Sequence, residues 1–141
     1  MTGSDYLHRL RTLAADIASL NTEINNLYGV RAAAGLNASA VKTNKGMVDQ
    51  TSETAIKAAT LSATQNQILS NYLDIYEKVF EVREQMQDRL QYAVLSSRYI
   101  LGKSWEVIAK ELNYSVQQIF RVHKLALAEF NRLWGLKYDD K

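Results

Sequence analysis

The amino-acid sequence predicts an all-α protein in which a long, coiled-coil-like antiparallel helical hairpin precedes a three-helix helix-turn-helix unit. Three observations predict this fold class. The 141 residues include no proline, which is the strongest breaker of helices. Apolar residues recur at spacings of three and four along most of the chain. Ser and Asp residues, which are preferred helix caps, stand where three C-terminal helices would begin.

The first predicted helix begins near residue 5 and carries a narrow apolar seam. The seam residues recur at alternating spacings of four and three over about three heptads, which is typical of a helix that faces a partner helix. They are Tyr6, Leu10, Leu13, Ile17, Leu20, Ile24 and Leu27. Gly29 or Gly35 is expected to end this helix, because glycine adopts the left-handed conformation found at helix C-termini.

A surface loop is predicted at residues 36–52, where the helical period is lost and Asn, Ser, Thr and Gly collect. From about Glu53 to Met86 apolar residues return at helical spacing and predict a second long helix. Residues 1–86 would then form a hairpin that buries both apolar stripes within one chain. The alternative is that the seam also faces a second subunit and forms a homodimer through the N-terminal helices.

Residues 87–136 are predicted to form three shorter helices, and residues 137–141 a polar, frayed tail. The predicted helices run from Asp88 to Gly102, from Trp105 to Leu112, and over residues 116–134. Six residues mark their limits by capping or turn preferences: Asp88, Gly102, Ser104, Asn113, Ser115 and Gln118. An eight-residue helix, a three-residue turn and a longer helix have the proportions of a helix-turn-helix.

The charge distribution indicates where a polyanion would bind. Between residues 98 and 137 basic residues outnumber acidic ones by seven to three, whereas the whole chain carries only +2. Residues 116–134 are therefore predicted to be a recognition helix in the major groove of double-stranded DNA, where Gln pairs with adenine, Arg with guanine and Lys with phosphate. The candidate DNA-binding residues are Ser115, Gln117, Gln118, Arg121, Lys124, Lys103 and Phe120.

Several motifs of the C-terminal third occur together in a known family. They are the Arg98–Tyr99 pair, the Trp-Glu-Val-Ile-Ala run at 105–109, the Glu-Leu-Asn turn at 111–113, the Ser115 cap and the Leu-Ala-Leu run at 125–127. On these residues the stretch 95–133 resembles region four of the main bacterial sigma factors. With the N-terminal hairpin, the chain is similar to small phage regulators, the late-gene activators of the RinA and ArpU kind, and to their relatives in prophages of Gram-positive bacteria. The resemblance implies binding to duplex DNA at a promoter or operator, with RNA polymerase as a further candidate partner.

Carried over position by position, the resemblance places five residues toward DNA: Val116, Gln117, Gln118, Phe120 and Arg121. The sequence departs from the family pattern at Val116 and Phe120, which stand where the family has polar or basic residues, and at Leu125, which stands where it has a basic one. Two roles for Phe120 remain open: contact with a thymine methyl group, or packing against the helix that precedes Gly102. No segment resembles the sigma region that melts promoter DNA, so an autonomous sigma factor is not expected.

Other kinds of function have little support in the sequence. The absence of cysteine excludes disulfides, thiolate metal sites and thiol nucleophiles. No phosphate loop, glycine fingerprint or metalloprotease motif occurs, so we expect neither an enzyme nor a cofactor. His8 and His123 lack ligand spacing, and Glu77, Glu81 and Glu84 are expected to form a solvent face. Trp105 and Trp134 are expected in the core. No secretory signal or membrane span is recognisable, so a cytoplasmic protein of a bacterial host is expected, with no membrane contact.

Three alternatives stay open at this stage. The chain could be a DNA-packaging protein of the small-terminase type, which also combines a helix-turn-helix with a coiled coil. It could be a protein-interaction module that binds no DNA. The three C-terminal helices could also be an ordinary packing unit, with Arg121 and Lys124 on a solvated face.

Overall fold

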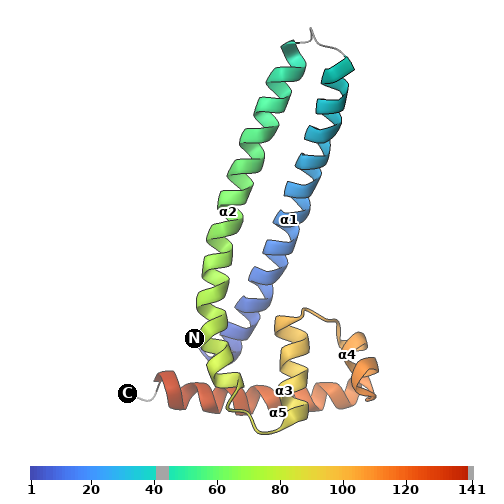
Figure 1. The fold of residues 1–141 in the computed structure, drawn as a ribbon. Helices are drawn as coiled ribbons and strands as arrows, with labels where there is room; N and C mark the ends of the chain where they lie inside the picture. The colour runs from blue at the N-terminus through green and yellow to red at the C-terminus, as the bar shows by residue number, and fades with distance from the viewer. Residues whose placement is uncertain (41–44, 140–141) are drawn as a thin grey trace. The chain divides into compact units, whose positions relative to one another are not determined.

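The computed structural model describes the backbone of residues 1–40 and 45–139 and the side chains of residues 1–29 and 52–138. Over these ranges the chain is helical and has no strand, which confirms the predicted all-α class. Five α-helices follow one another (Figure 1): α1 (Gly3–Ala40), α2 (Lys45–Arg83), α3 (Arg89–Leu95), α4 (Trp105–Leu112) and α5 (Val116–Trp134). Two π-helical turns, η1 (Ser96–Ile100) and η2 (Gly135–Asp139), extend α3 and α5.

Contacts divide the chain into two compact units. Unit 1 comprises Met1–Ala15 and Asn71–Lys141, and unit 2 comprises Asp16–Ser70. The boundary predicted at residues 86–87 falls inside unit 1, where Met86 and Leu95 share one core cluster.

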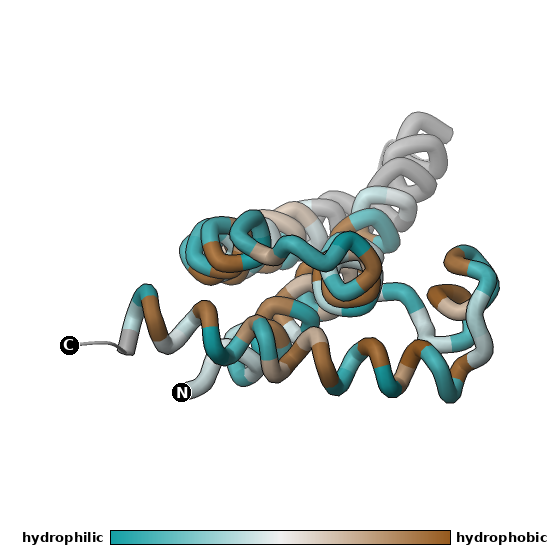
Figure 2. The backbone as a smooth tube through the Cα atoms, turned by 90° about the horizontal axis from the view of Figure 1, so that it is seen from below, coloured by the Kyte–Doolittle hydropathy of each residue, from teal (hydrophilic) through white to brown (hydrophobic). Residues whose placement is uncertain are grey.

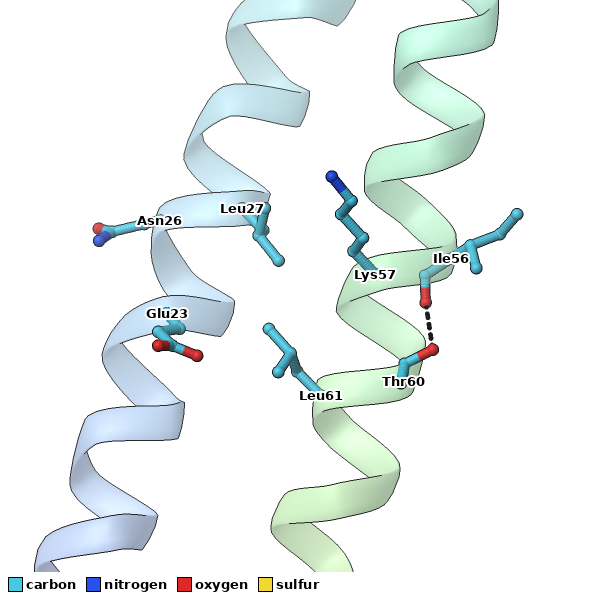
Figure 3. A pocket seen from close by; sticks show the side chains of 7 residues that line it. All are labelled: Glu23, Asn26, Leu27, Ile56, Lys57, Thr60 and Leu61. Carbon is cyan, nitrogen blue, oxygen red and sulfur yellow. Dashed lines mark hydrogen bonds between the residues drawn. The ribbon is translucent and has the colours of Figure 1, made fainter.

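Unit 2 consists of adjacent stretches of α1 and α2. The Gln65 side-chain amide donates a hydrogen bond of 3.2 Å to the backbone carbonyl of Ile17. Ile24 and Ala58 are buried. Leu27 of α1 and Leu61 of α2 point toward each other in an open, largely apolar groove (Figure 3). Apolar side chains on facing stripes thus stabilise this pair of helices.

The predictions of a helix end at Gly29 or Gly35 and of a loop over residues 36–52 are wrong for the described backbone. Helix α1 continues to Ala40 and α2 already begins at Lys45, while residues 41–44 lie outside the described residues. The segment 31–40 is rich in alanine, the best helix former, and contains no proline. A glycine inside a helix costs only about 1 kcal/mol relative to alanine, which such a run offsets.

The main core of unit 1 lies between the start of α1, the end of α2, α3, η1 and α5. Its buried residues are Leu7, Leu10, Val79, Val82, Met86, Leu95, Tyr99, Ala126, Phe130, Leu133 and Trp134. Trp134 is therefore a core residue, as expected from the sequence. Burial of these large apolar side chains is the dominant stabilising contribution to this unit.

The first turn of α1 fits closely against α5. A Cβ atom on Gly3 would lie 2.9 Å from two atoms of the Phe130 ring and 2.9 Å from the Trp134 Cβ, so any larger residue here would force these side chains to move. The Ser4 amide donates a hydrogen bond of 2.7 Å to the Asn131 side-chain oxygen. These contacts join residues that are 127 positions apart in the sequence.

The prediction of a frayed tail from residue 137 is wrong for residues 137–139. The η2 turn continues through Asp139, and Tyr138 packs against the main core. The Tyr138 hydroxyl donates a hydrogen bond of 3.0 Å to Glu81, and the Lys137 ammonium lies 3.0 Å from the same carboxylate. Burial and the bond to Glu81 raise the pKa of Tyr138 to about 12. An aromatic ring and an ion pair thus order a segment that is polar in composition.

The limits of the three shorter helices agree with the sequence prediction because they are set by local hydrogen bonds. The Asp88 carboxylate accepts from the amides of Leu90 and Gln91, and the Ser104 hydroxyl accepts from the Val107 amide. Asn113 adopts the predicted left-handed conformation, with φ 62°. Gly102, before α4, has φ 68°, where a side chain would be strained.

Candidate nucleic-acid interface

A small cluster of buried side chains holds α4 and α5 against α3. Val94, Ile108 and Ile119 have no exposed surface, and Ala109 is 4 % exposed. Trp105, Leu112 and Val116 are partly buried against this cluster. Because Ala109 is small, α4 and α5 approach each other closely, and the left-handed residue Asn113 turns the chain from one helix into the next.

The outward face of α5 carries the predicted base-reading residues. Gln117, Arg121 and Lys124 are all exposed and lie at spacings of four and three, which places them on one side of the helix. Ile119 and Ala126, on the opposite side, have no exposed surface. Hydrophobic and hydrophilic residues accordingly alternate along the tube of α5 (Figure 2). The helix therefore presents amide, guanidinium and ammonium groups to solvent in a single column.

The basic side chains on α5 and before α4 differ in whether their charge is already neutralised. Among the described residues, Arg121 and Lys124 form no ion pair, so both remain available to an anion. Lys103, by contrast, lies 2.6 Å from the Glu111 carboxylate, and Arg132 lies 2.6 Å from Glu129. Lys103 is thus the predicted phosphate contact that fits least well.

The predicted site residues Ser115 and Gln118 form the start of α5. The Ser115 hydroxyl accepts from the Gln118 amide at 3.1 Å, and the Gln118 side-chain oxygen accepts from the Ser115 amide at 2.9 Å. This is the capping box that the sequence predicts. Paired readout of adenine requires both the oxygen and the nitrogen of an amide. Gln117 has both atoms free within the described part of the chain, whereas Gln118 has its oxygen engaged.

Phe120 lies at the edge of the same exposed face. Its side chain is 46 % exposed, and its ring meets the Trp105 ring edge-on, with centroids 5.3 Å apart. The ring of Phe120 therefore contacts α4, and its packing against the helix before Gly102 stays a prediction. Val116, which the resemblance places toward DNA, instead packs partly against the small buried cluster.

Arg98 supports α4 rather than facing solvent. Its guanidinium lies 4.4 Å from the centre of the Trp105 ring and donates a hydrogen bond of 3.1 Å to the Lys103 carbonyl. Burial is the main cause that lowers the pKa of Arg98, with a smaller effect from the charge of Arg11. The Arg98 side chain thus fixes the segment that leads into α4.

A stack of aromatic rings behind the exposed face includes His123, which the sequence analysis left without a role. The His123 Nε2 lies 2.6 Å from the Tyr99 hydroxyl, and its ring stacks on that of Tyr99 and meets the Trp105 ring edge-on. The His8 ring also contacts Tyr99, in a T-shaped arrangement with centroids 5.2 Å apart. The signal in the sequence was the position of His123, which follows the buried Ile119 by four residues and so lies on the inward face.

We expect the stability of the protein to fall as the pH is lowered from about 6.5 toward 4. Burial, aided by the charges of His8 and Arg98, lowers the pKa of His123 to about 4 from its ordinary value of 6.5. In this range the unfolded chain binds a proton that the folded protein does not, so the free energy of unfolding decreases with falling pH. With allowance for partial exposure we expect a loss of about 1–2 kcal/mol.

Urea unfolding followed by circular dichroism between pH 7 and 4 measures this effect. The variant His123→Phe keeps a ring in the stack and should lose much of the pH dependence. His8→Gln removes an exposed histidine whose charge contributes less than burial to the lowered pKa of His123, so this variant should retain most of the pH dependence. Equal pH dependence in wild type and His123→Phe would contradict the assignment.

The predicted seam of α1 is covered to different degrees. Leu10 is buried in the core of unit 1, and Ile24 is 6 % exposed in unit 2. The other predicted seam residues are partly buried: Tyr6, Leu13, Ile17, Leu20 and Leu27. The seam is therefore partly occupied within the chain, and association through it stays a prediction.

Over the described ranges, no group of His, Asp or Glu side chains is arranged to hold a metal ion. None of the helices in those ranges combines the length and hydrophobicity that crossing a bilayer requires. Comparison with protein-family models, with curated proteins and with solved structures finds no match to this chain.

Proposed function

We propose that this protein binds double-stranded DNA sequence-specifically and regulates transcription, with α5 as the recognition helix in the major groove. The observation that carries the proposal is the exposed column of Gln117, Arg121 and Lys124, whose two basic members form no ion pair in the described part of the chain. These are the side chains that recognise adenine, guanine and phosphate.

The contacts that position α5 favour a surface that recognises base pairs over a surface that is only solvated. A recognition helix must hold its side chains in register with the base pairs. Here the capping box of Ser115 and Gln118 sets the start of α5, and the left-handed Asn113 sets its connection to α4. Buried Ile119 fixes the rotation of α5 about its axis. The rigid part of the protein thus lies directly behind the exposed column.

The roles of the remaining parts of the chain follow from the same proposal. The helices of residues 1–86 serve self-association or contact with a protein partner, of which RNA polymerase is the candidate that the sigma-like segment suggests. The regulator is of the phage or prophage type, acts in the bacterial cytoplasm, and is not an enzyme. A dimer would bind two half-sites about 10 bp apart, or a multiple of that spacing.

Fluorescence anisotropy of the full chain on duplexes from its own genome, over a series of salt concentrations, tests the proposal. We expect sequence-dependent binding whose log affinity falls linearly with log salt, by about 0.9 per phosphate contacted. Lys124→Ala should reduce this slope by about 1 while leaving the sequence preference unchanged. Lys103→Ala is the matched control. It removes an ammonium group that is already paired with the Glu111 carboxylate, so it should change the slope less.

Each alternative function has its own outcome in this experiment. The absence of binding even at low salt would contradict the proposal and favour a protein-interaction module. An apolar side chain on α5 supports that alternative, because Leu125 is 62 % exposed. A ring of eight or more subunits in light scattering would instead favour a packaging protein.

A further inference from the structure

Phe120 is an exposed apolar side chain at the edge of a polar face. Residues three and four positions apart are neighbours on a helix surface, so Phe120 lies between Gln117 and Lys124. Its side chain is 46 % exposed, although large apolar side chains gain free energy when they are removed from water. The T-shaped contact with the Trp105 ring leaves this surface exposed.

The ring of Phe120 is also held in place. Trp105, against which it packs, is itself contacted by the Arg98 guanidinium at 4.4 Å and by the His123 ring at 4.6 Å. A side chain whose position is set before binding loses less conformational entropy when a ligand covers it. Phe120 therefore has the two properties of a recognition element: exposed apolar surface and a supported orientation.

We infer that Phe120 reads the 5-methyl group of thymine, and so makes this protein distinguish thymine from every other base at one position of each half-site. This inference rests on the DNA-binding function proposed above. In the major groove the thymine methyl is the one apolar group that a base edge presents, and phenylalanine is among the side chains that contact it. Gln117 and Lys124 on either side would place adenine and phosphate contacts next to this thymine.

A protein partner is the competing occupant for an exposed aromatic ring. The neighbours of Phe120 argue for DNA, because a positive charge at Lys124 and a further one at Arg121 flank it, both unpaired among the residues described. Protein interfaces are depleted of lysine relative to the rest of the surface. Leu125, which is more exposed and lies on the other flank of α5, provides a matched apolar control.

The test replaces single thymines of the preferred duplex by deoxyuridine, which removes one methyl group and leaves base pairing intact. The full chain should lose about fourfold in affinity at one position of each half-site, as expected for one buried methyl group. Phe120→Ala should bind the thymine and uracil duplexes equally. Leu125→Ala should keep the fourfold preference.

Several outcomes would overturn the inference while leaving the proposed function intact. One is sequence-specific binding in which no position is sensitive to the loss of the methyl group. Another is a preference of Phe120→Ala for thymine over uracil that is as large as that of the wild type. Loss of self-association in Phe120→Ala, with its thymine preference unchanged, would assign the ring to a protein contact. Failure of the wild-type chain to bind any duplex would instead reject both proposals.

Circular dichroism shows whether Phe120→Ala retains the helical content of the wild type. Should it not fold, Phe120→Leu keeps an apolar contact with Trp105 but has a shorter reach. Its preference for thymine over uracil is then expected to fall below twofold. A preference as large as that of the wild type would overturn the inference.

Discussion

Replacing Arg121 with alanine is expected to weaken binding to the preferred duplex by about 1–3 kcal/mol, which is about 5- to 150-fold, and to relax the sequence preference at one base pair. The guanidinium is exposed on the outward face of α5 and forms no ion pair with any described residue. It is therefore free to donate two parallel hydrogen bonds to a guanine edge. Anisotropy titrations on the preferred duplex and on its single-base variants measure both effects.

Arg132→Ala is the matched control for this prediction. It removes the same charge from the same helix, but the Arg132 guanidinium is engaged by Glu129 at 2.6 Å. We expect a small, sequence-independent loss of affinity. Arg121→Lys keeps the charge and loses the paired geometry, so it should bind with weakened discrimination. An identical binding isotherm for wild type and Arg121→Ala would reject the assigned role.

Replacing Phe130 with alanine is expected to lower the free energy of unfolding by about 3–5 kcal/mol. The side chain has no exposed surface and occupies the main core of unit 1, where α5 meets Gly3 in the first turn of α1. Truncation removes its apolar contacts and leaves a cavity that the rigid backbone fills only in part. Urea unfolding followed by circular dichroism measures the change.

Leu125→Ala shortens an apolar side chain of the same helix that is 62 % exposed, and should change stability by no more than about 0.5 kcal/mol. A cost for Phe130→Ala as small as that of Leu125→Ala would contradict the packing described for unit 1. Both substitutions introduce alanine into α5. The difference between their free energies of unfolding therefore measures the loss of core packing rather than a change in helix propensity.

The helix limits in the C-terminal third could be predicted because they depend on neighbours in sequence. The hydroxyl of Ser104 caps the amide three residues later, the box of Ser115 and Gln118 spans three residues, and the amide of the left-handed Asn113 donates to the carbonyls of Ala109 and Lys110. By contrast, the loop predicted at residues 36–52 was wrong over its described part. Polar composition suggested a loop there, but residues 36–40 and 45–52 contain no proline and are helical.

The sequence by itself determined the helical class, the ends of α4 and α5, and the residue types of the exposed face, because helical period and capping act over a few residues. The tertiary structure decided which of the polar side chains are already bound to another part of the protein and which are free to bind a ligand. Glu111 neutralises Lys103 from eight positions away, and Tyr99 binds His123 across twenty-four. Such pairs depend on how helices pack, which the order of residues along the chain does not reveal.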